Sequence, residues 1–163
     1  MALEGQEPIK FKMFGWLLLV DRLNTRNMLK RRHYVVLDNN YACMLCQNPP
    51  EEIVEHLFFS CPAARRILHR LGLRLLAMPI ADLFSTTLPP TLPDTVRPFM
   101  LLLFLWKIWD ARNKKVFQNI ELDASQTLVA ILDDLITWSH RLRTETLRGH
   151  AGLWRDFLSS RNL

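Results

Sequence analysis

Long hydrophobic runs are missing from this chain of 163 residues. Its longest apolar stretch, residues 99–106, ends at Lys107 after eight residues, whereas a membrane-spanning helix needs about 20. Residues 1–9 contain two glutamates and no basic residue before an apolar segment, which is unlike a secretory signal peptide. We therefore expect an intracellular protein, nuclear or cytoplasmic, with no membrane among its partners.

Cysteine is also scarce, and three cysteines without a secretory signal do not indicate a disulfide framework. No glycine-rich phosphate loop and no pair of nucleophile and base stand out in the sequence. We therefore expect that the protein is not an enzyme. Because 49% of its residues are hydrophobic and 23% are charged, the chain can nevertheless bury a real core.

All three cysteines lie in one short stretch, together with one of the five histidines. The spacing of Cys43, Cys46, His56 and Cys61 predicts a Cys-Cys-His-Cys zinc site, since two cysteines separated by two residues supply adjacent corners of a tetrahedron. Four protein ligands leave no open coordination position, so the zinc would hold structure and would not activate water. The alternatives are three free buried cysteines and a hydrogen-bonded core histidine.

The positive charge of the chain is unevenly distributed. The net charge is +5, and residues 1–74 hold 11 Lys and Arg against 7 Asp and Glu, while the remainder holds 10 against 9. The half of the chain with the cysteines therefore carries most of the excess. Such an excess favours an anionic partner, although many proteins with this charge bind none.

Two short helices are expected to carry basic ridges. Asn24 or Thr25 can cap a helix that runs to about Arg32, while Pro62 and Gly72 are typical of the start and end of another. If the first helix extends back to Arg22, then Arg22, Arg26 and Lys30, which are spaced by four residues, share one of its faces. The alternative is a solvated helix face. The residues predicted to contact RNA or DNA are Arg22, Arg26, Lys30, Arg31, Arg32, Arg65, Arg66 and Arg70.

The predicted fold is mainly α, with a small zinc-stapled helical unit followed by a C-terminal helical segment. We expect the zinc unit over residues 9–75, a proline-rich linker over 76–98 and a helical region over 99–163. Within these regions we expect a mostly buried helix at residues 9–20 and further helices at 99–117 and 124–143, the last opened by a capping box of Asp123 and Gln126. We also expect a short strand or extended segment at 33–37, a turn at 38–40, a helix start at 49–52 and a short terminal stretch at 153–158, which follows Gly149 and Gly152.

Aromatic residues could belong to the core or stack on bases. Trp106 and Trp109 share one face of the predicted 99–117 helix, and we assign them to the core. Tyr34 and Phe58 are the candidates for base stacking in the basic half, although core packing is the simpler interpretation.

The order of the motifs resembles the zinc-binding domain that follows reverse transcriptase in plant LINE-type retroelements. The resemblance covers residues 9–75 and rests on Lys10-Phe-Lys-Met-Phe-Gly-Trp16, Arg22-Leu-Asn-Thr25, Cys43-Met-Leu-Cys46 and Glu52-Ile-Val-Glu-His56-Leu-Phe-Phe-Ser-Cys61. The stretch Trp109-Asp-Ala-Arg112-Asn113-Lys-Lys-Val-Phe117 is similar to the segment that follows this domain in the same polyproteins. The resemblance implies a domain that helps a reverse transcriptase to hold template RNA or target DNA.

The endonuclease, polymerase and ribonuclease H domains of such polyproteins do not fit this sequence. Because Met1 lies just upstream of the domain, we expect a free-standing fragment. One hypothesis is a nucleic-acid-binding zinc module. The other is a protein-interaction or regulatory domain, in which the 99–117 helix is the working surface and a host protein or a second copy covers it. The third possibility is that the fragment retains no function.

Overall fold

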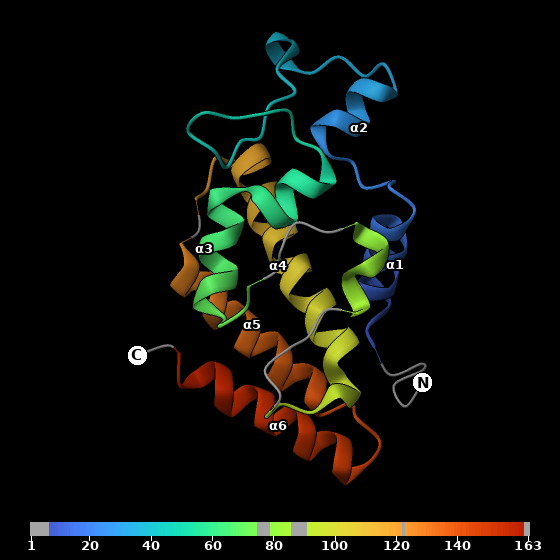
Figure 1. The fold of residues 1–163 in the computed structure, drawn as a ribbon, viewed down its shortest axis with the longest axis vertical. Coiled ribbons are helices and arrows are strands. Elements are labelled where there is room, and N and C mark those ends of the chain that lie inside the picture. The colour runs from blue at the N-terminus through green and yellow to red at the C-terminus, as the bar shows by residue number, and fades with distance from the viewer. Residues whose placement is uncertain (1–6, 75–78, 86–90, 122, 162–163) are drawn as a thin grey trace.

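The computed structural model describes residues 7–74, 79–85, 91–121 and 123–161, and these residues form helices and no strand (Figure 1). The mainly α fold predicted from the sequence is therefore confirmed. The α-helices are α1 (Ile9–Leu19), α2 (Arg26–Arg31), α3 (Pro62–Arg70), α4 (Arg97–Gln118), α5 (Ala124–Ser139) and α6 (Glu145–Ser159). Shorter helical turns cover Leu37–Asn39, His56–Ser60, Ile80–Ser85 and Asp94–Val96. No helix in the described ranges is long and apolar enough to cross a bilayer.

α4 lies at the centre of the molecule, with α1, α3 and α5 packed against it. After Arg97, residues 98–106 of this helix are apolar on every side, which suits a helix that is surrounded by others. Phe99 stacks on Trp138 of α5 at 3.6 Å between ring centroids and meets the edge of Phe11 of α1 at 5.3 Å. The tryptophan stripe of α4 is core, as predicted: Trp109 is 9% exposed, and Trp106 packs on Phe11.

The burial of α4 corrects one prediction. The predicted 99–117 helix, which we expected to offer a docking surface, corresponds to α4 and lies in the middle of the core. The large apolar side chain that α4 exposes is Phe117, in its last turn. A buried helix has its apolar faces already covered within the chain, so α4 cannot present them to a partner.

The zinc unit and the C-terminal helices share one hydrophobic core. α3 packs on α5, and α1 packs on α4, so contacts cross the predicted linker in two places. Parts of that linker, residues 75–78 and 86–90, lie outside the described residues. The described part contributes Leu83 and Val96 to the core, each 0% exposed.

α1 is buried on one side, where the sequence predicted a mostly buried helix. Phe11, Phe14 and Leu18 face the core, and Gly15 lets α4 come so close that an added Cβ would lie 2.8 Å from Leu102 Cδ2. The opposite side carries exposed apolar residues, namely Ile9, Met13, Trp16, Leu19 and Val20.

The C-terminal part differs from the prediction in its boundaries. The capping box of Asp123 and Gln126 is confirmed, but α5 ends at Ser139 and a full helix, α6, follows. α6 runs through Gly149 and Gly152, whereas the sequence predicted only a short terminal stretch at 153–158 after these glycines. The apolar row Leu147, Ala151, Trp154 and Leu158 packs into the core, and this burial outweighs the cost of about 1 kcal/mol for each glycine.

The loop that carries the first two cysteines also differs. The segment at 33–37, predicted as a short strand or an extended segment, forms no strand, although Val36 has extended backbone angles. The predicted helix start at 49–52 instead contains Glu51, which forms an isolated antiparallel bridge with Ala42. This bridge folds the chain back, so that the cysteines come to face His56. The turn predicted at 38–40 is confirmed, with positive φ angles of 57° at Asp38 and 49° at Asn39.

Candidate metal centre and basic surface

The four predicted ligands converge on one point. Cys43 and Cys46 lie on the loop after the Ala42 bridge, His56 begins a helical turn, and Cys61 follows the end of that turn. The three Sγ atoms and a ring nitrogen of His56 all lie within 4.8 Å of one another. Cys43, His56 and Cys61 are buried, and Cys46 is half-buried.

The distances suit a tetrahedral zinc ion. Cys46 Sγ lies 3.3 Å from His56 Nε2 and 3.5 Å from Cys61 Sγ, while Cys43 Sγ lies 4.0 Å from Cys61 Sγ. In a tetrahedron with Zn–S bonds of about 2.3 Å, neighbouring sulfurs are about 3.8 Å apart. The donor set therefore fits zinc, and three thiolates with one imidazole are a usual structural set.

A π-helical turn aligns His56 with Cys61. The backbone N–H of Cys61 donates to the carbonyl oxygen of His56 at 2.6 Å, five residues back, and residues of π geometry often lie at functional sites. The wider turn brings both side chains to the metal side, while Leu57, Phe58 and Phe59 enter the core. Phe58 is fully buried and therefore cannot stack on a base.

The three thiols differ in acidity. The pKa of Cys61 falls to about 5, because its sulfur accepts a hydrogen bond from Cys43 and is also close to the backbone N–H groups of Ala64 and Ala63 at the start of α3. The hydrogen bond to Cys61 and burial raise the pKa of Cys43, and burial raises the pKa of Cys46 to about 11. Zinc binding near neutral pH therefore has to displace the protons of Cys43 and Cys46.

The first basic ridge is largely occupied by contacts within the chain. Asp21 has a φ of 50° and breaks the helix, so Arg22 lies in the loop and does not share a face with Arg26 and Lys30. Thr25 caps α2, accepting a hydrogen bond from the backbone N–H of Met28. The contacts of the other four are Arg31 with Asp21 at 2.6 Å, Lys30 with Glu51 at 3.1 Å, Arg32 with Asn24 at 3.2 Å and Arg26 with the Asn40 carbonyl oxygen.

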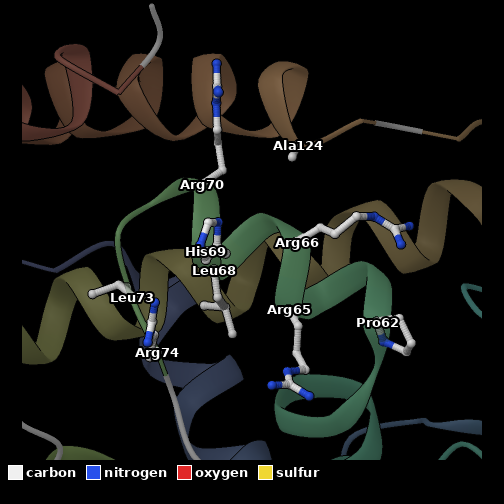
Figure 2. Close-up of a pocket in the computed structure, with 9 residues that line it drawn as sticks. All are labelled: Pro62, Arg65, Arg66, Leu68, His69, Arg70, Leu73, Arg74 and Ala124. Atoms are coloured by element: carbon white, nitrogen blue, oxygen red, sulfur yellow. The ribbon is translucent and has the colours of Figure 1, made fainter.

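The second basic ridge faces a cavity. Arg65, Arg66 and Arg70 of α3 line a hollow of about 600 Å³ together with His69 and Arg74 (Figure 2). The rest of its lining is apolar, and it comes from Pro62, Leu68, Leu73 and Ala124. No acidic side chain lines this cavity, and the four arginines form no ion pair within the part of the chain that the structure describes.

Zinc and the second ridge are directly linked. α3 begins at Pro62, immediately after the ligand Cys61, so the metal would set the position of the helix. Three thiolates and one Zn²⁺ leave a net charge of about −1 on the centre. The charge of Arg66 acts favourably on the Cys46 thiolate, and it therefore partly compensates this excess.

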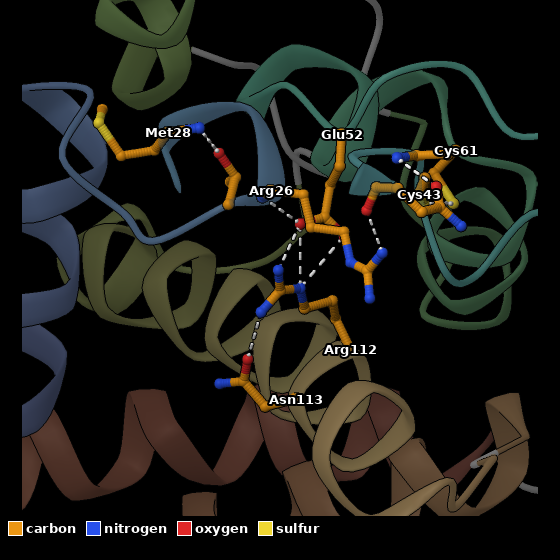
Figure 3. A network of polar contacts seen from close by, with 10 residues as sticks. Arg26, Met28, Cys43, Glu52, Cys61, Arg112 and Asn113 are labelled. Carbon is orange, nitrogen blue, oxygen red and sulfur yellow. Dashed lines mark hydrogen bonds and ion pairs between the residues drawn. The ribbon is translucent and has the colours of Figure 1, made fainter. Parts of the chain in front are cut away.

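Sequence reasoning missed a buried ion pair beside the metal centre. Glu52 is 0% exposed and Arg112 of α4 is 2% exposed, and Arg112 Nε lies 3.1 Å from each carboxylate oxygen of Glu52 (Figure 3). The backbone N–H of Arg26 donates to the same carboxylate at 2.9 Å. Asn113 Oδ1 accepts from Arg112 Nη1 at 2.9 Å, and the Arg112 guanidinium lies 4.8 Å from the centroid of the Trp109 ring.

This ion pair accounts for two motifs that lie far apart in the sequence. Glu52 is the glutamate four residues before His56 in the second zinc motif. Arg112 belongs to the 109–117 segment, which is a separate motif in the sequence. A charged residue within an otherwise apolar helix face was the available signal for Arg112. Its partner, 60 residues away, could not be identified without the fold.

Comparison with known proteins adds one finding. Residues 4–67 match the model of a family described as zinc-binding in reverse transcriptase, and this range contains all four candidate ligands. No curated protein and no solved structure matches the chain. The family description does not specify a class of element or a source, so the plant LINE-type assignment stays a prediction.

Proposed function

We propose that this protein is a zinc-held module that binds RNA or DNA, and the match of residues 4–67 to the family described as zinc-binding in reverse transcriptase supports this proposal. The observation that carries the proposal is the position of Arg65, Arg66 and Arg70. They lie on the helix that starts next to the last zinc ligand, and they have no carboxylate partner among the described residues. Zinc would serve as a staple, and the closed ligand set offers no position for catalysis.

Phosphates of a nucleic acid would supply the missing anionic partners. A protein that neutralises phosphates releases condensed counterions, so its affinity falls as salt rises. Arginine suits this role because its planar guanidinium can donate two parallel hydrogen bonds to one phosphate. Contacts of this kind position the nucleic acid and do not read its sequence.

A salt titration tests the proposal. Binding of the zinc-loaded chain to a fluorescent 12-nucleotide single strand would be followed by anisotropy at several salt concentrations. Substituting Arg65→Gln together with Arg66→Gln should reduce the slope of log affinity against log salt by about 1.4, since each phosphate contact with a single strand contributes about 0.7. Affinity should fall at low salt in particular.

A control with the same loss of charge separates local contacts from net charge. Lys115→Gln with Arg155→Gln also removes two positive charges, but from surface ion pairs with Glu121 and Asp156. This variant should keep the original slope. If the zinc-loaded chain binds neither single-stranded nor duplex RNA or DNA in a salt-dependent way, the proposed function is wrong.

A second candidate function is docking to another protein, and it is favoured by the exposed apolar row on α1. Ile9, Met13 and Trp16 are spaced by four and three residues on one face, the exposed Val20 follows at the C-cap, and Trp16 is 58% exposed. Scattered apolar side chains are normal on surfaces, but a continuous helical row indicates an interface. Light scattering at several concentrations would detect a dimer formed through this face, and Trp16→Gln should return it to monomers.

A further inference from the structure

The cavity beside α3 combines two chemical surfaces. Leu68 and Leu73 are buried and form an apolar floor, while Arg65, Arg66, His69 and Arg74 are exposed around it. Figure 2 shows the three arginines of α3 leaving the helix in different directions, with Arg70 extending toward the ribbon of α5. A volume of about 600 Å³ lies within the usual range for small-molecule sites, about 300–1,000 Å³.

The end of α3 builds the floor. Gly72 has a φ of 76°, and the backbone N–H groups of Gly72 and Leu73 donate to the carbonyl oxygens of His69 and Leu68, both at 2.9 Å. This is a Schellman motif, in which the residue after the glycine packs back on the last helical turn. The motif therefore places Leu73 beside Leu68 and returns Arg74 to the rim of the cavity.

Arg70 also lines the cavity, and its guanidinium is incompletely paired within the described residues. Its Nε is buried from solvent and has no hydrogen-bond partner in the described structure. A buried N–H group without a partner is costly, and most such groups in folded proteins are hydrogen-bonded. Because this Nε is closed to solvent, an anionic ligand in the cavity would meet the exposed guanidinium groups of Arg65, Arg66 and Arg74.

We propose that this cavity takes one unpaired nucleotide of a single-stranded RNA or DNA, an inference that rests on the proposed function. The base lies against Leu68 and Leu73, and the flanking phosphates contact the arginines. Bases in a duplex expose only their edges in the grooves, so they cannot reach the floor of a hollow between two helices. An unpaired base can turn outward and stack on guanidinium or imidazole planes such as those of Arg66 and His69.

The test compares three probes of the same length with the zinc-loaded chain: a 12-nucleotide single strand, its duplex, and an abasic single strand. The single strand should bind more tightly than the other two. Arg70→Gln with Arg74→Gln should weaken single-strand binding by about tenfold or more, given the usual strength of hydrogen bonds to charged groups. The Lys115→Gln and Arg155→Gln control should not reproduce this loss.

A variant that leaves the charge unchanged separates the cavity from general electrostatics. Ala124 lines the cavity in the first turn of α5, and Ala124→Phe would fill part of the space intended for the base. We expect this variant to lose the preference for the single strand and to keep the salt slope of duplex binding. Circular dichroism and zinc content would verify that it folds.

The possible failures can be distinguished. If the chain binds no nucleic acid, both the proposed function and this inference are wrong. If it binds single strand, duplex and abasic strand equally well, and Ala124→Phe changes nothing, the arginines contact phosphates only and the nucleotide cavity is wrong while the proposed function stands.

Discussion

Glu52 has the clearest individual role among the charged side chains of this protein. Its carboxylate joins the loop before His56, the first turn of α2 and the guanidinium of Arg112 on α4. Both members of the pair are almost completely buried, where a charge without a partner is very costly. Glu52 therefore fixes the metal-binding loop to the central helix, although it does not ligate the metal.

Glu52→Gln should lower the free energy of unfolding by about 3–5 kcal/mol, because it leaves the Arg112 charge buried without its counter-ion. Urea denaturation of the zinc-loaded protein measures this value. Glu55→Gln, an exposed carboxylate three residues further on, is the matched control and should change stability by less than about 0.5 kcal/mol.

The double variant Glu52→Leu with Arg112→Met tests the explanation itself. Replacing a buried ion pair by apolar residues is often neutral, so most of the lost stability should return. A double variant as unstable as Glu52→Gln would show that the cost does not come from the uncompensated charge.

At the scale of elements, the position of a glycine at the end of a helix or inside it decides whether the backbone requires glycine there. Gly72 adopts the left-handed conformation that closes α3, and an added Cβ would lie 2.8 Å from Arg161 Cζ. Gly149 and Gly152 have the opposite character, since they lie within α6 and an added Cβ would meet nothing within 4 Å. Glycine is therefore needed at the first position and costs stability at the other two.

Substitution by alanine should stabilise the protein at Gly149 and Gly152 and destabilise it at Gly72. Gly149→Ala and Gly152→Ala should each raise the free energy of unfolding by about 0.5–1 kcal/mol, because alanine restricts the unfolded chain and favours the helix. Gly72→Ala should lower it by about 1–2 kcal/mol, the cost of a left-handed L-residue. Thermal and urea denaturation would measure all three, and a stabilising Gly72→Ala would contradict the structure of the α3 terminus.

At the scale of the whole molecule, the metal centre and the C-terminal helices form one structure. α3 starts at a zinc ligand and packs on α5, while Glu52 holds the same loop to α4. Loss of zinc should therefore also destabilise the C-terminal helices, which contain the buried residues Trp138 and Trp154.

Chelation of zinc should lower the melting temperature of the whole chain by at least about 10 °C in one transition, seen both by circular dichroism and by tryptophan fluorescence. Structural zinc contributes an apparent 10–16 kcal/mol in finger peptides, and about 1 kcal/mol corresponds to 2–4 °C in a chain of this size. Cys43→Ser should have the same effect without a chelator.

Gln47→Ser is the control for the loop, because Gln47 is exposed and is not a candidate ligand. It should retain one zinc ion per chain, measured by elemental analysis, and the original melting temperature. Separate transitions for circular dichroism and tryptophan fluorescence would mean that the two halves fold independently.

The features that depend on neighbouring residues were predictable from the sequence. The four candidate ligands, the Thr25 cap, the capping box at Asp123 and the helix terminator Gly72 all follow from short spacings, because caps and metal ligands have strict local geometry. The mainly α class followed for the same reason, since helical periodicity is a local property.

Tertiary structure decided which surfaces are covered and which charges are paired. Only the fold shows that α4 is buried, that α1 exposes an apolar row, and that Glu52 meets Arg112 across 60 residues. It also shows that the basic residues of α2 are largely held by contacts within the chain, while those of α3 surround a cavity. Spacing in the sequence places a side chain on a helix face, but burial and ion pairing depend on the segments that pack against that face.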